Sequence, residues 1–91
     1  MTDDHLALKR KRLLFRSVRR GTKETDLIIG GFARTWLGRL DERQLDRFEA
    51  LLEQNDPDVL AWVLGMAPTP PAFDHDLIRL IQTYKDSIPR P

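Results

Sequence analysis

Apolar residues recur along this chain at intervals of three and four positions, the spacing of one face of an α-helix. The first such stretch predicts a helix over residues 4–20, which Gly21 is expected to end because glycine leaves helical geometry at little cost. The apolar positions of this helix are Leu6, Leu13 and Val18 on the inner face, with Leu14 and Phe15 beside them. No stretch alternates strictly between apolar and polar residues, so the pattern predicts helices and no half-buried strand.

A second helix is expected to start after a cap at Thr22 and to reach about residue 40. Its apolar positions are Ile28, Ile29, Phe32, Trp36, Leu37 and Leu40. Gly30 and Gly31 lie inside this helix, where two glycines cost roughly 1–2 kcal/mol relative to alanine. The pair either permits the close packing of another helix or marks a kink, and the sequence leaves both interpretations open.

Three further helices complete the pattern. Asp41 and Gln44 have the spacing of a capping box in front of the third helix. The inner face of that helix consists of Leu45, Phe48, Leu51 and Leu52. In the fourth helix, Asp56 is expected to cap the start and Gly65 to end it. After a stiff connector at residues 68–71, the fifth helix carries its apolar residues at Phe73, Leu77, Leu80, Ile81 and Tyr84.

These elements predict an all-α fold, a small five-helix bundle formed by a single domain over residues 1–91. We expect a short flexible N-terminus at about residues 1–4 and a frayed tail at about residues 87–91. The apolar share of 41% is typical of a globular chain. The longest apolar runs, at residues 27–33 and 60–67, are much shorter than the roughly 20 residues of a membrane span, so no membrane insertion is expected.

The absence of cysteine excludes a disulfide scaffold, a thiol nucleophile and a cysteine-ligated metal. The two histidines, His5 and His75, are far apart in the chain, so a histidine-rich metal site is not expected either. The acidic start, with Asp3 and Asp4, leads into no apolar segment and resembles neither a signal peptide nor a transit peptide. We therefore expect the protein to be cytoplasmic.

Charge is distributed unevenly, although the net charge is only +1. Residues 1–23 carry eight Lys or Arg against two Asp, and residues 24–91 carry seven against twelve acids. The run Lys9-Arg10-Lys11-Arg12 allows two interpretations. It could belong to a small basic nucleic-acid-binding module, or it could be a solvated basic helix face, which the interleaved apolar residues favour.

Few residues form a pattern with obvious chemistry. His75, between Asp74 and Asp76, could suggest a metal or acid–base site, but a solvated first turn of the last helix explains it more simply. Trp36 and Trp62 are expected in the core or at its edge, with an interface anchor as the alternative. No nucleophile–base pair and no phosphate-binding loop motif is present, so we predict no catalytic residue and no metal site.

The remaining candidate is a helix–glycine–helix corner at residues 19–26, which we call the corner. Arg20 lies at the end of the first predicted helix, and Glu24 lies at the start of the second. By spacing alone, simple capping and a local Arg–Glu pair explain this arrangement. An exposed pair of that kind contributes only about 0–1 kcal/mol.

Residues 20–24 of the corner fit the R-G-x-x-E signature of the succinate dehydrogenase flavinylation factors, which comprise bacterial SdhE-type proteins and the mitochondrial succinate dehydrogenase assembly factor two. Asp26 and Phe32 also resemble residues of that family. The segment 51–58 with Trp62 resembles its L-L-E-x-x-D-P-D…W pattern, and residues 80–84 resemble its last helix. Two departures are Thr25, where leucine is common, and the glycine pair inside the second helix.

The resemblance implies a five-helix, non-enzymatic assembly factor of the bacterial cytoplasm. It would bind the flavoprotein subunit of succinate dehydrogenase and promote covalent attachment of FAD to that partner, with fumarate reductase as a second candidate. The implied partner-binding residues are Arg19, Arg20, Gly21, Lys23, Glu24 and Asp26. No dinucleotide-binding fold is evident, so we expect FAD to be handled on the partner and not held tightly by this chain. We further expect a monomer that binds no nucleic acid.

Overall fold

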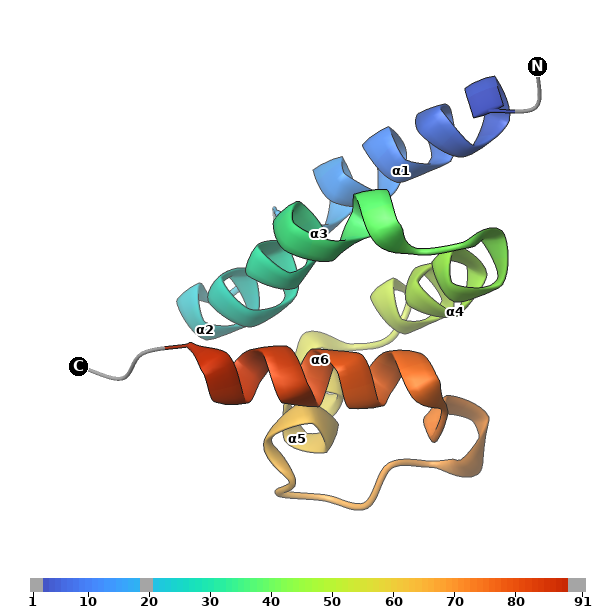
Figure 1. Ribbon diagram of the computed structural model, residues 1–91. Helices are drawn as coiled ribbons and strands as arrows, with labels where there is room; N and C mark the ends of the chain where they lie inside the picture. Colours follow the sequence, from blue (N-terminus) through green and yellow to red (C-terminus); the bar gives the residue numbers. More distant parts are fainter. Residues whose placement is uncertain (1–2, 19–20, 89–91) are drawn as a thin grey trace.

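A computed structural model describes residues 3–18 and 21–88 (Figure 1). Its helices are α1 (Asp3–Ser17), α2 (Lys23–Thr25), α3 (Gly31–Trp36), α4 (Glu42–Leu52), α5 (Asp56–Leu64) and α6 (Asp76–Ser87). A π-helical turn, η1 (Asp26–Gly30), joins α2 to α3, and two 3-10 turns, η2 (Leu37–Arg39) and η3 (Pro71–Phe73), complete the helical elements. Because α2, η1, α3 and η2 follow one another directly, the described chain forms five helical segments without a strand. The predicted all-α, five-helix fold is therefore confirmed.

The segment from α2 to η2 lies between α1 and α6, with which it shares the core (Figure 1). Phe32 of α3 is fully buried at the centre of that core. Its ring centroid lies 5.7 Å from that of Phe48 on α4 and 6.1 Å from those of Trp36 and Tyr84. One aromatic side chain thus connects three of the five helical segments. The inner face predicted for α4 is also buried as expected.

Gly30 and Gly31 stand where other parts of the fold approach closely, which confirms the close-packing interpretation of the pair. Their backbone angles, φ −64° and −63° with ψ −42°, are those of a regular helix and show no kink. The π-helical turn ends at Gly30, and α3 begins at Gly31. A Cβ atom on Gly31 would collide with the Tyr84 hydroxyl of α6. A Cβ atom on Gly30 would lie 2.8 Å from Asp26 Oδ1 and 3.4 Å from the Ser17 carbonyl oxygen of α1. The glycines therefore let α1 and α6 pack against opposite parts of one helix.

Local capping follows the sequence in most places. Asp41 and Gln44 form the predicted capping box, with reciprocal hydrogen bonds of 2.8 and 3.1 Å. Gly65 ends α5 in the left-handed conformation, with φ of 75°. Asp56 was expected to cap α5, and this was wrong. Asn55 occupies the cap position without a side-chain hydrogen bond to the helix, and the Asp56 carboxylate has a partner elsewhere in the fold.

The first helix is shorter than predicted. It ends at Ser17, Val18 forms a turn, and Arg19 and Arg20 lie outside the described residues. Phe15 was expected beside the inner face, but its side chain is 60% exposed. Its position on the helix turns it away from the core that Leu13 enters, because successive residues of an α-helix are about 100° apart around the axis.

The two tryptophans lie at the edge of the core, as predicted. Both are partly buried against it, and Trp62 stacks on Phe73 with ring centroids 5.2 Å apart.

Along the described residues, no helix is long and apolar enough to span a membrane.

Candidate partner-binding corner

The described part of the corner is an exposed turn that leads into a helix. Gly21, Lys23 and Glu24 are exposed, whereas Asp26 is half-buried. Lys23 and Glu24 belong to α2, so both side chains leave the first turn of the helical segment that reaches residue 39. A carboxylate at this end of a helix is favoured by the helix dipole. Arg19 and Arg20, the other two predicted binding residues, lie outside the described residues.

Gly21 is tied to α5 by a hydrogen bond between distant parts of the chain. Its backbone N–H donates to Asp56 Oδ2 at 2.9 Å. Asp56 is the first residue of α5, and the bond joins the entrance of α2 to the entrance of α5. A Cβ atom on Gly21 would lie 3.6 Å from the same oxygen, which is ordinary van der Waals contact. The fold itself therefore leaves space for a small side chain at Gly21, and the position is open towards solvent.

Thr22 and Thr25 stabilise the start of α2. The Thr22 hydroxyl oxygen accepts a hydrogen bond from the Thr25 backbone N–H at 3.1 Å, which confirms the predicted cap. The two hydroxyl groups also lie 2.7 Å apart and share a hydrogen bond. Thr25 is 1% exposed, so its hydroxyl would be costly to bury without this partner. Thr25 stands where leucine is common in the resembling family, and its buried hydroxyl is satisfied by this local hydrogen bond.

Asp26 begins the π-helical turn directly behind the exposed residues. Its Oδ1 atom is buried and accepts no hydrogen bond within the described parts of the chain. The same oxygen faces the backbone of Gly30, where a side chain would collide with it. A buried acceptor without a donor costs free energy. Asp26 therefore combines an unsatisfied acceptor with an irregular helical turn, a feature that is frequent at functional sites.

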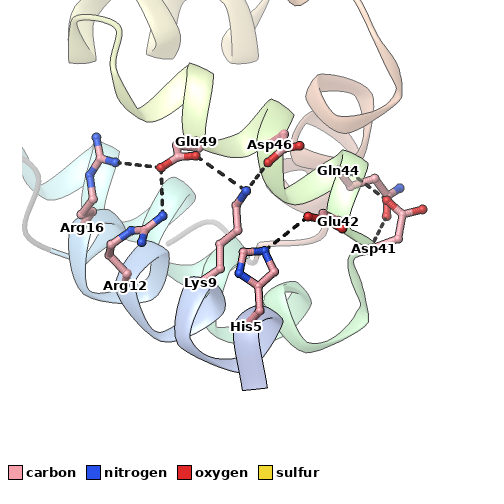
Figure 2. A network of polar contacts seen from close by, with 9 residues as sticks. All are labelled: His5, Lys9, Arg12, Arg16, Asp41, Glu42, Gln44, Asp46 and Glu49. Atoms are coloured by element: carbon pink, nitrogen blue, oxygen red, sulfur yellow. Dashed lines mark hydrogen bonds and ion pairs between the residues drawn. The ribbon is translucent and has the colours of Figure 1, made fainter. Parts of the chain in front are cut away.

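Most basic residues of α1 form polar contacts within the protein; Lys11 is exposed. Figure 2 shows α1 facing α4, with Lys9 reaching Asp46 and Glu49, and Arg12 and Arg16 both directed to Glu49. The distances from Glu49 Oε2 are 3.2 Å to Arg12 Nη2 and 3.7 Å to Arg16 Nη1. Only 11% of the Lys9 side chain is exposed.

Arg10 is used internally as well, through hydrogen bonds of 2.9 and 2.8 Å to the backbone oxygens of Leu37 and Leu40. The interpretation as a solvated basic face therefore holds for Lys11 and Arg12, which are exposed. It does not hold for Lys9 and Arg10, which pair with α4 and with the end of the second helical segment. The same contacts weaken the nucleic-acid alternative, since cations already paired within the fold are less available to phosphates.

His75 serves the start of α6, as the simpler interpretation had it, but as the half-buried N-cap residue in front of the helix and not as a solvated residue of its first turn. Its Nδ1 atom accepts a hydrogen bond from the Ile78 N–H at 3.4 Å. Partial burial, followed by the nearby Arg47 guanidinium, lowers the pKa of His75 below its usual value. The neighbouring Asp76 carboxylate accepts a hydrogen bond from Gln44, which together with Arg47 lowers the pKa of Asp76. No group of three or more His, Asp or Glu side chains suited to a metal ion occurs within the described ranges.

The protein family described as the flavinator of succinate dehydrogenase matches residues 11–85. The chain belongs to this family. It is 40% identical over 75 residues to the mitochondrial succinate dehydrogenase assembly factor 2 of Dictyostelium discoideum, a match that covers 82% of this chain and 53% of that protein. It is also 40% identical over 70 residues to the FAD assembly factor SdhE of Acetobacter pasteurianus, covering 77% of this chain and 64% of that protein.

A third relative is the succinate dehydrogenase assembly factor 2 of Saccharomyces cerevisiae strain YJM789, which is 32% identical over 90 residues. That match covers 94% of this chain and 56% of the yeast protein. The chain thus spans between half and two thirds of the length of these relatives. The resemblance stated from the sequence motifs is confirmed at the level of the family.

In this flavinator-family chain, the two segments that carried the resemblance come together in space. The described part of the first segment, residues 21–24, is joined to residues 51–58 by the hydrogen bond between Gly21 and Asp56. Sequence reasoning noted Asp56 only as part of a pattern and as a helix cap. The occurrence of both segments in one chain was the available signal, but spacing alone does not reveal a contact across 35 residues.

Proposed function

We propose that this protein promotes the covalent attachment of FAD to the flavoprotein subunit of succinate dehydrogenase, with the flavoprotein of fumarate reductase as a second candidate partner. Membership of the flavinator family supports the process. The exposed corner points to the residues that carry this function. The hydrogen bond between Gly21 and Asp56 holds the corner against α5. A preorganised turn loses less conformational freedom when a partner binds.

In this proposal the protein acts by binding and not by catalysis. The corner offers an ammonium group at Lys23, carboxylates at Glu24 and Asp26, and a bare backbone at Gly21. These groups suit recognition of a protein surface. To promote flavinylation, the corner must bind the competent conformation of the flavoprotein more tightly than other conformations. A preference of about 1.4 kcal/mol would shift that equilibrium tenfold.

Each corner residue has a distinct role in this mechanism. Gly21 allows the partner backbone to approach closely, because it has no side chain in between. Glu24 accepts hydrogen bonds from donors of the partner, and Lys23 and Asp26 form the charged rim. Arg19 and Arg20, outside the described residues, would supply planar guanidinium groups for carboxylates of the partner or for the region around its cofactor. FAD is handled on the partner, and this protein acts as a monomer.

The test is co-expression of the flavoprotein subunit with variants of this protein, followed by in-gel flavin fluorescence of the denatured subunit. Glu24→Ala removes an exposed carboxylate, so thermal melting should hardly change while covalent flavin falls several-fold. Glu42→Ala, which removes an exposed carboxylate from the first turn of α4, is the matched control and should leave flavinylation unchanged.

Substitutions of Gly21 separate the close approach of the partner from the folding of this protein. Gly21→Ala should fold normally, because the added Cβ meets Asp56 at an ordinary distance. Gly21→Arg should also fold but should block the partner and abolish most flavinylation. Full flavinylation by both Glu24→Ala and Gly21→Arg would exclude the corner as the working surface.

A further inference from the structure

An open groove lies along α1 and is closed on one side by Arg34 of α3. The two helices lie beside each other in the fold (Figure 1). Its volume is about 600 Å³. It is lined by Leu8, Lys11, Arg12, Leu14, Phe15, Val18 and Arg34. Leu8 is 68% exposed and Phe15 is 60% exposed, so two large apolar side chains on one face of α1 have more than half of their surface exposed. Apolar surface gathered in a groove is typical of an interaction site.

The charged residues of the groove are all cations. Arg12 also forms an ion pair with Glu49 of α4, with 3.2 Å between Arg12 Nη2 and Glu49 Oε2. Lys11 and Arg34 are exposed, and neither forms an ion pair with another residue of the described chain. The lining includes no acidic side chain. A complementary ligand therefore carries an apolar group for the floor and negative charge for the rim.

We propose that this groove is a second docking surface for the flavoprotein subunit and that it receives an amphipathic acidic segment of that subunit. An apolar side chain of the segment lies between Leu8 and Phe15, and carboxylates of the same segment face Lys11 and Arg34. The inference rests on the proposed function, because the same partner occupies the corner and the groove.

The groove and the corner are close enough in the fold to serve one partner. Val18, which lines the groove, precedes Gly21 by three residues. The carbonyl oxygen of Ser17, at the end of α1, approaches the backbone of Gly30 in η1, the turn that Asp26 begins. Two contacts on one partner reinforce each other, because the first raises the effective concentration for the second.

A protein segment fits the groove better than a nucleic acid does. Phosphate binding relies on several available cations, but Lys9, Arg12 and Arg16 are directed to acids of α4. The groove instead presents four apolar residues between its cations. Apolar contact with a charged rim is the usual arrangement of a protein–protein interface.

The apolar contact is tested by Leu8→Ser, with Met66→Ser as the matched control. Met66 is 77% exposed and does not line the groove. Both substitutions change a surface residue, so both proteins should melt close to the wild-type temperature. Leu8→Ser should raise the dissociation constant for the purified flavoprotein subunit about tenfold, whereas Met66→Ser should leave it unchanged.

The charge contact is tested by Lys11→Glu combined with Arg34→Glu. The control is Arg43→Glu, which reverses an exposed charge of α4 outside the groove. The double variant should bind at least tenfold more weakly, mainly through a slower association rate at low salt. In addition, a carbodiimide should cross-link the Lys11 amine to a carboxylate of the flavoprotein. Lys11→Arg should keep the affinity and lose that cross-link.

The outcomes separate this inference from the proposed function. If the wild-type protein drives flavinylation but Leu8→Ser and the charge-reversed variant bind like their controls, the groove inference is overturned and the proposed function stands. If the wild-type protein neither binds the flavoprotein nor raises its covalent flavin, both fail. Groove-dependent binding of a DNA or RNA duplex, in place of the flavoprotein, would also overturn the inference.

Discussion

The backbone N–H of Gly21 and the carboxylate of Asp56 are joined by a 2.9 Å hydrogen bond that links the entrances of α2 and α5. The bond fixes one edge of an otherwise exposed turn. Asp56 therefore has a tertiary role, although Asn55 and not Asp56 occupies the cap position of α5. A side chain that serves as the anchor of a distant turn should affect function more than it affects stability.

The first prediction concerns this anchor. Asp56→Ala removes the acceptor of the Gly21 N–H, and because Gly21 is exposed, water can replace it. We expect a loss of about 0.5–1.5 kcal/mol in the free energy of unfolding, measured by urea titration. Covalent flavin on the co-expressed partner should fall by more than half, because the turn is no longer held. Asp58→Ala, in the same first turn of α5, is the control and should lose stability without losing flavinylation.

The second prediction concerns the contact between Gly31 and Tyr84. Gly31→Ala gains up to about 1 kcal/mol of helix propensity but forces the Tyr84 ring to move, at a cost of about 1–3 kcal/mol. The net result should be a lower melting temperature. Tyr84→Phe removes the hydroxyl that the new Cβ would meet. In a double-mutant cycle, Gly31→Ala should therefore be less damaging in the Tyr84→Phe background, and additive effects would contradict this packing.

The third prediction concerns the acidic partner of the α1 cations. Glu49 lies within 4 Å of Lys9, Arg12 and Arg16. Glu49→Gln removes the negative charge that these three cations share, so they become more available to an external anion. Stability should change by about 0–1 kcal/mol for each of the Arg12 and Arg16 pairs, because those side chains are 58% and 37% exposed. The Lys9 pair should matter more, because only 11% of the Lys9 side chain is exposed. Non-specific DNA affinity should rise, and its dependence on salt should steepen by about two to three counterions. Equal DNA binding by wild type and variant would show that the pairs do not restrain these cations.

The fourth prediction follows from the lowered pKa of His75. The folded state resists protonation of this imidazole, whereas the unfolded chain binds the proton near pH 6.5. The contribution of His75 to stability is therefore complete above about pH 6.5 and is lost as the pH falls towards the lowered pKa of the folded state. Protonation also removes the lone pair of Nδ1 that accepts from Ile78.

His75→Asn keeps a side chain that can cap the helix but cannot titrate. Unfolding free energies of both proteins should be compared between about pH 7.5 and 5. The wild-type protein should lose more stability over this range than the variant. The lowered pKa of Asp76 acts in a separate window, below about pH 4, where its contribution is lost on protonation. Parallel curves for the two proteins between pH 7.5 and 5 would contradict the assignment to His75.

The sequence by itself determined the features that depend on neighbours along the chain. The capping box of Asp41 and Gln44, the cap at Thr22 and the buried face of α4 follow from interactions over three or four residues, which helical periodicity makes visible. The motif around Gly21 likewise indicated the family before any contact was known.

Only the tertiary structure decided what lies opposite each surface. The charge of Lys9 could face solvent or another helix, and the packing of α1 on α4 brings it to Asp46 and Glu49. Phe15 was expected beside the inner face of its helix, but the rotation of α1 about its axis exposes it beside the groove. The hydrogen bond from Gly21 to Asp56 crosses 35 residues. Such pairings depend on the relative orientation of helices, which is set by how the whole core packs and not by any local pattern.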